Sequence, residues 1–157
     1  MVWIKRFLIL ALVALVAIQF VPVDLNEDGY GSVTPFLEET KPTAEVESIL
    51  KETCFDCHSD QTQYPWYASV APVNFWLEEH IEDGKRHLNF SEWDSYSAKR
   101  KDHKLDELIE EVEEGEMPLE SYTYIHENAN LSAAQIAAMV RWATAARTNY
   151  SIGDQPQ

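Results

Sequence analysis

The sequence predicts an all-α fold, and three observations support this prediction. Apolar residues recur at the helical spacing of three and four positions in several segments after residue 42. No segment shows a convincing apolar–polar alternation of the kind that marks a half-buried strand. Proline, glycine and hydroxyl residues stand at the ends of the helical segments, where they commonly start or stop helices. We therefore expect one helical domain over residues 43–150.

The N-terminal segment is typical of an export signal. Lys5 and Arg6 supply its positive charge, and residues 7–23 are almost wholly apolar. This apolar run is at the short end for a membrane span, and no small-residue cleavage pattern follows it. We expect residues 1–23 to be an uncleaved transmembrane anchor in the cell inner membrane, with the rest of the chain on the periplasmic side. The alternative is a cleaved signal peptide and a periplasmic protein.

Two segments show no helical period. Residues 24–42 contain Gly29, Gly31, Pro35 and Pro42 among polar side chains, which indicates a linker that holds the domain away from the bilayer. Residues 151–157 are expected to form a flexible tail.

The first helix of the domain is predicted over residues 43–53. Thr43 is a suitable N-cap, and Val46, Ile49 and Leu50 form one apolar face. This helix leads directly into the most specific motif of the chain.

That motif is Cys54-Phe55-Asp56-Cys57-His58, which has the C-x-x-C-H spacing of c-type haem attachment. Two thiols three positions apart lie about one helical turn apart, so each can form a thioether with one vinyl group on the same porphyrin edge. An imidazole directly after the second thiol can bind the iron. We predict one covalent haem c, bound by Cys54 and Cys57, with His58 as the proximal iron ligand.

Other uses of this motif fit less well. A zinc site normally needs four protein ligands, or three and a water, and the chain has only two cysteines. A disulfide between Cys54 and Cys57 would close too short a loop to stabilise the fold much. A redox-active dithiol pair would be expected beside a strand–helix–strand pattern, which is not seen here.

Two further helices are predicted after the motif. The segment 72–83 has Pro72 in its first turn and Gly84 after its end. The segment 98–114 is highly charged, carries a narrow apolar stripe and ends at Gly115. Because basic residues come early and acidic residues late in this second helix, packing must stabilise it against its own dipole.

The last helix is predicted over residues 132–147. Ser132 and Gln135 have the spacing of a capping box at its start. Ile136, Met139 and Val140 lie on its apolar face.

The sixth iron ligand is predicted to be Met117. It lies outside any helix, between Gly115 and Pro118, so its sulfur can reach the ring face opposite His58. His80 and Met139 are expected to be core residues, and His103 to be solvated. His87 and His126 remain open as candidate ligands, as does a vacant sixth position.

Two kinds of supporting group are also expected. His58 needs an acceptor for its second ring nitrogen, and we expect a backbone carbonyl near Pro65 or Pro72 to supply it. Lys85 and Arg86 are candidates for pairing with the haem propionates.

The charge of the chain bears on its partners. With 12 basic and 27 acidic residues, the protein is expected to repel nucleic acid and anionic lipid. The same charge favours redox partner proteins with a basic docking surface, although it equally serves solubility.

The motifs resemble those of the small haem-binding domain proteins of bacteria. This resemblance implies a cytochrome-c-like helical domain around one covalent haem, with His58 and Met117 as the two axial ligands. It rests on Cys54-Phe55-Asp56-Cys57-His58-Ser59, Tyr64-Pro65-Trp66-Tyr67, His80 with Gly84, Leu88-Asn89-Phe90-Ser91 with Trp93, and Gly115-Glu116-Met117-Pro118.

These features favour a one-electron carrier outside the cytoplasmic membrane rather than an enzyme. A peroxidase-like enzyme would need an open distal position and an acid–base group such as His80 or His126. A haem-based sensor would need an output domain, and the sequence shows none.

Overall fold

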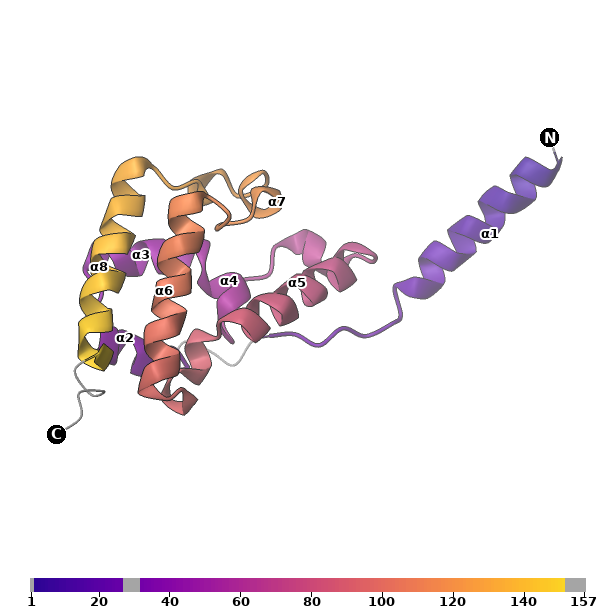
Figure 1. Cartoon of the computed structure of the whole chain (residues 1–157). Helices are drawn as coiled ribbons and strands as arrows, with labels where there is room; N and C mark the ends of the chain where they lie inside the picture. Colours follow the sequence, from indigo (N-terminus) through magenta and orange to yellow (C-terminus); the bar gives the residue numbers. More distant parts are fainter. Residues whose placement is uncertain (1, 27–31, 152–157) are drawn as a thin grey trace.

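The computed structural model describes residues 2–26 and 32–151, and regular structure within these ranges is helical throughout (Figure 1). The predicted all-α class is therefore confirmed. The α-helices are α1 (Val2–Ile18), α2 (Thr34–Thr40), α3 (Ala44–Thr53), α4 (Phe55–His58), α5 (Val73–His87), α6 (Ala98–Glu114), α7 (Glu120–Thr123) and α8 (Ala133–Ser151). Short 3₁₀ turns are η1 (Trp66–Ser69), η2 (Phe90–Ser95) and η3 (Glu127–Ala129).

Helices α6 and α8 lie side by side and form the largest helix–helix contact of the domain (Figure 1). The capping predictions for both are confirmed. Gly115 ends α6 in the left-handed conformation with φ of 77°, which glycine adopts without strain. At the start of α8, the Ser132 hydroxyl accepts from the Gln135 N–H at 3.3 Å and the Gln135 side chain accepts from the Ser132 N–H at 2.9 Å.

The predicted linker contains a helix that belongs to the core, so the expectation of a linker over residues 24–42 is wrong for α2. Phe36 is 0% exposed and its ring lies 4.5 Å from that of Phe90 and 5.0 Å from that of Trp93. Trp142 donates a 3.1 Å hydrogen bond to the carbonyl of Thr40 at the end of α2. Proline is tolerated in the first turn of a helix, which is where Pro35 lies, so it does not mark a linker here.

The predicted helix over residues 43–53 is confirmed as α3. Thr43 caps it by accepting a hydrogen bond from the N–H of Val46 at 3.3 Å.

The predicted end of helix α5 is wrong: the helix continues through Gly84 to His87 instead of ending at Asp83. Close packing against α4 explains why a glycine stands inside this helix, since a Cβ at Gly84 would lie 2.7 Å from the carbonyl oxygen of Cys57. Gly84 is thus a helix-contact residue and not a helix stop.

The two ends of the chain also differ from expectation. Helix α8 runs to Ser151, and the rest of the expected tail, residues 152–157, lies outside the described residues. Helix α1 projects from the body and buries none of its side chains (Figure 1).

The transmembrane anchor expected over residues 1–23 is not found. In the part of the chain that the structure describes, no helix has the length and apolarity needed to cross a bilayer. Helix α1 has 17 residues and ends at Ile18, four positions before Pro22. At about 1.5 Å per residue it is about 25 Å long, shorter than the roughly 30 Å of a hydrocarbon core.

The segment that follows α1 is attached to the domain. The Gln19 side chain donates to the carbonyl of Ala71 at 3.1 Å and accepts from its N–H at 3.0 Å. Further along, the Asn26 amide donates to the carbonyl of Ser59 at 2.6 Å. The start of the predicted linker therefore lies along the domain surface.

Candidate functional site

The residues predicted to bind the cofactor line one cavity. Cys54, Cys57, His58 and Met117 all border a space of about 500 Å³ between α4, α5, α6 and the chain after α6. This volume falls within the range of roughly 300–1,000 Å³ typical of ligand pockets. The apolar part of the wall comes from Leu88, Phe90, Leu108, Val112, Pro118, Leu119 and Leu131.

The C-x-x-C-H motif forms a single helical turn at this cavity. The N–H of His58 donates to the carbonyl of Cys54 at 2.9 Å, which closes the turn of α4. Phe55 is buried, and its ring lies 5.4 Å from that of Phe90 in the aromatic core. Because Phe55 points into the core, the two thiols and the imidazole of the same turn are left to line the cavity.

Both cysteines are free thiols in this structure. Burial raises the pKa of Cys54 and of Cys57 to about 11 each, and the Asp56 carboxylate adds to the effect at Cys57. The thiols are therefore protonated at neutral pH. A reactive dithiol pair needs the opposite shift, since the thiolate is the attacking species, so this environment disfavours a redox-active dithiol.

The imidazole of His58 is held as a neutral metal ligand would be. Its Nδ1 lies 3.0 Å from the carbonyl oxygen of Leu88, and a carbonyl oxygen can only accept, so Nδ1 carries the proton. Burial lowers the pKa of His58, which keeps the ring neutral. Nε2 is thereby left with a lone pair available to a metal.

The expectation that a carbonyl near Pro65 or Pro72 accepts from His58 is wrong, because the acceptor is the carbonyl of Leu88. Helix α5 ends at His87, and Leu88 is extended with φ of −147° and ψ of 122°. Outside the helix, the carbonyl of Leu88 has no partner within α5 and can accept from the histidine. The sequence carried no sign of this contact, because 30 residues separate the two groups.

Met117 reaches the cavity from the loop after α6. The N–H groups of Glu116 and Met117 donate to the carbonyl of Glu111 at 3.0 and 3.1 Å, which bends the loop back over the end of the helix. The side chain of Met117 then lines the same cavity as His58. Ligation of iron by Met117 stays a prediction.

Two histidines of α5, His80 and His87, also border the cavity. The Nδ1 of His80 donates to the carbonyl of Trp76 at 2.8 Å, and the two rings lie 4.2 Å apart. His80 is thus a half-buried residue of the rim and not the core residue expected.

Met139, His103 and His126 do not line the cavity. Met139 is fully buried in the core, as expected. His103 is exposed beside Glu107, also as expected. His126 stacks on Tyr122, with ring centroids 4.2 Å apart.

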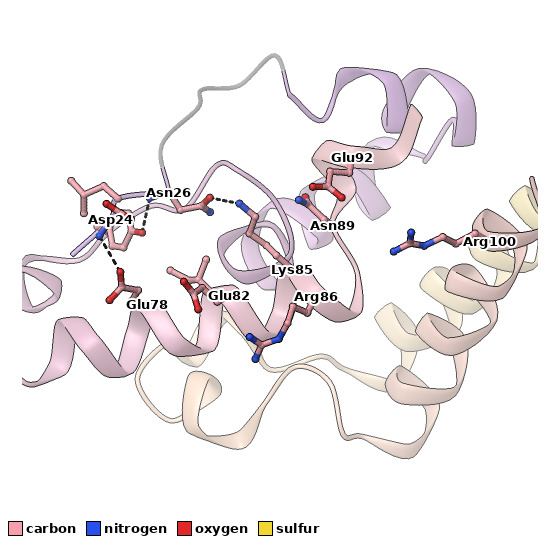
Figure 2. A pocket seen from close by; sticks show the side chains of 12 residues that line it. Asp24, Asn26, Glu78, Glu82, Lys85, Arg86, Asn89, Glu92 and Arg100 are labelled. Atoms are coloured by element: carbon pink, nitrogen blue, oxygen red, sulfur yellow. Dashed lines mark hydrogen bonds between the residues drawn. The ribbon is translucent and has the colours of Figure 1, made fainter. Parts of the chain in front are cut away.

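Lys85 and Arg86 do not border this cavity. They lie on the opposite face of α5, in a polar cavity of about 530 Å³, where Lys85 donates to the Asn26 side chain at 2.7 Å (Figure 2). Arg86 pairs with Asp83 at 2.6 Å. These two candidates for pairing with the propionates thus lie away from the cysteine cavity, because the helical period places them on the other face of α5. The cationic group that does line the cysteine cavity is Lys104 of α6, paired with Glu107 at 2.6 Å.

The arrangement as a whole fits an iron porphyrin. An apolar space is bordered by two thiols one turn apart, by a neutral imidazole with its metal-binding nitrogen available, and by a thioether. Over the described ranges there is no cluster of three or more His, Cys, Asp or Glu residues that could hold a metal ion.

The comparisons with known proteins give one match. A family model described as the haem-binding domain matches residues 13–145. This range includes every residue that lines the cysteine cavity. A search of curated proteins and a search of solved structures find no match.

Proposed function

Because the chain belongs to the haem-binding domain family, we propose that it is a single-haem, c-type electron carrier. The observation that supports this proposal is the meeting of Cys54, Cys57, His58 and Met117 at one apolar cavity. Haem supplies the one-electron ferric–ferrous couple when bound. The protein supplies covalent attachment, two axial ligands and exclusion of water.

The cysteines attach the cofactor. In such an attachment the S–H bond of each thiol would break, the sulfur would bond to the vinyl carbon next to the ring, and the hydrogen would go to the terminal vinyl carbon. This addition needs no oxidant or reductant. The spacing of Cys54 and Cys57 along one turn of α4 suits two vinyl groups on the same edge.

In this proposal His58 and Met117 are the residues that would hold the haem iron. The Leu88 carbonyl fixes the tautomer of His58, so that Nε2 is the nitrogen that binds iron. A thioether opposite the histidine raises the reduction potential, because it favours the ferrous state. With both residues bound to the iron, the site would be suited to electron transfer and would have no position open to a substrate.

The proposal includes a location and a partner. The apolar segment over residues 1–23 would direct export, since c-type attachment generally takes place on the outer face of the bacterial inner membrane. The excess of 27 acidic over 12 basic residues favours a redox partner with a basic docking surface. Fractionation of the native host tests the location, and recovery of the protein in the cytoplasm would contradict it.

The attachment is tested by mass spectrometry of the full chain expressed with a c-type maturation system. We expect the mass to increase by one haem that denaturant does not remove. The variants Cys54→Ala and Cys57→Ala should each retain at most one thioether, which shifts the reduced visible band. A full-length chain of unmodified mass, from cells that mature another c-type protein normally, would refute the proposal.

A peroxidase-like activity is a second candidate, because His80 borders the cavity beside the predicted ligands. It predicts fast cyanide binding by the wild-type protein and peroxide turnover that falls in His80→Ala. The electron-carrier proposal predicts slow cyanide binding that becomes fast in Met117→Ala.

A further inference from the structure

We propose that Tyr122 fastens the segment carrying Met117 onto the C-x-x-C-H turn, and so holds the methionine sulfur at the iron. The segment in question is residues 117–131, which we name the closing segment. This inference rests on the proposed function and adds a positioning residue to it.

The closing segment covers one side of the cavity, and its helix α7 has little packing of its own. It contributes Met117, Pro118, Leu119, Tyr122 and Leu131 to the lining. Helix α7 has only four residues and none of them is buried. Because apolar burial holds α7 weakly, its position depends on a few specific contacts.

The strongest of these contacts ends on the attachment motif itself. The Tyr122 hydroxyl donates to Oδ2 of Asp56 at 2.8 Å, and Asp56 lies between the two cysteines. The carboxylate is held in place on its other side, since Oδ1 accepts from the N–H of Gln63 at 2.9 Å. A hydrogen bond to an ionised acceptor is stronger than one between neutral groups. Tyr122 thus joins the closing segment directly to α4.

The tyrosine is held in the orientation that this bond requires. The ring of His126 stacks on it with centroids 4.2 Å apart and an interplanar angle of 21°. The Nδ1 of His126 also lies 3.1 Å from the carbonyl of Tyr122. Burial and the nearby Asp56 raise the pKa of Tyr122 well above its usual range, so the hydroxyl remains a donor at neutral pH.

The few residues between Tyr122 and Met117 form a stiff segment of backbone. The N–H of Tyr122 donates to the carbonyl of Leu119 at 3.0 Å, so residues 119–122 form one turn. Pro118 then stands between this turn and Met117 and fixes one backbone angle. Releasing Tyr122 would remove the restraint on Met117 that comes from α4 and leave the one from α6, through the carbonyl of Glu111.

The test compares Tyr122→Phe with Tyr124→Phe in the full-length, haem-loaded protein. Both changes remove one hydroxyl from neighbouring positions, but Tyr124 is 87% exposed and serves as the matched control. The measurements are the near-infrared ferric band of the iron–thioether bond as a function of temperature, and the rate of carbon monoxide binding to the ferrous protein. We expect Tyr122→Phe to lose the band at a lower temperature and to bind carbon monoxide about tenfold faster. Tyr124→Phe should match the wild type.

The second variant, Asp56→Asn, keeps the tyrosine and weakens its acceptor, so it serves if Tyr122→Phe folds poorly. The double variant should bind carbon monoxide no faster than the faster single variant, because both remove the same contact. Additive effects in this cycle would overturn the inference, as would a Tyr122→Phe rate within twofold of the wild type. A wild-type protein with covalent haem but without the thioether band would instead overturn ligation by Met117.

Discussion

Replacing Gly84 with alanine tests the close contact between α5 and the attachment turn. In an exposed helix the change would stabilise the protein by about 1 kcal/mol, because alanine has the higher helix propensity. Here the new Cβ would lie 2.7 Å from the carbonyl oxygen of Cys57, and 3.2 Å from its carbonyl carbon and Cβ. These atoms belong to the backbone and the base of a side chain, so the helices must move apart. Overpacking of this kind costs about 1–3 kcal/mol.

The two effects oppose each other, and we expect the clash to be larger. Gly84→Ala should lower the free energy of unfolding by up to about 2 kcal/mol relative to the wild type, the difference between the two effects. Urea denaturation followed by circular dichroism measures this, with Glu79→Ala on the exposed side of α5 as the control. A gain in stability equal to the propensity difference would refute the contact, because it would mean that α5 does not approach Cys57 closely.

Three further predictions test the site, the core and the α6–α8 contact. Met117→Ala should abolish the ferric iron–thioether band and lower the midpoint potential, as measured by redox titration, since the sulfur ligand is lost. Phe36→Ala should destabilise the protein by about 3–5 kcal/mol in urea, the cost of removing a core aromatic side chain, whereas a linker residue would cost almost nothing. The hydrogen bond from Arg147 lowers the pKa of Asp102 below the ordinary value of 3.8. This bond therefore stabilises the folded protein at neutral pH, and the stabilisation is lost as the pH falls below 3.8 and the carboxylate is protonated. Arg147→Met should remove this acid-dependent stabilisation, which is about 1 kcal/mol or less for so exposed a pair. Measurements of the free energy of unfolding from pH 6 to pH 3 test this.

The sequence determined the features that depend on neighbouring residues. Thr43 and Ser132 mark helix starts because a cap bonds to an N–H two or three positions away. Gly115 ends α6 because its backbone conformation is a local property. The spacing of the C-x-x-C-H motif places its thiols on one turn for the same reason. Cys54, Cys57 and His58 accordingly lie together at one cavity.

Only the tertiary structure decided the features that join distant parts of the chain. Phe36 belongs to the core because α2 packs against η2, although its local sequence is typical of a linker. Gly84 lies inside a helix and not at its end, and glycine is needed there because α4 lies too close for a side chain. The carbonyl that orients His58 comes from Leu88, and the hydroxyl on Asp56 comes from Tyr122, which is 66 residues away. Local propensities contain no information on such contacts, because packing between helices sets them.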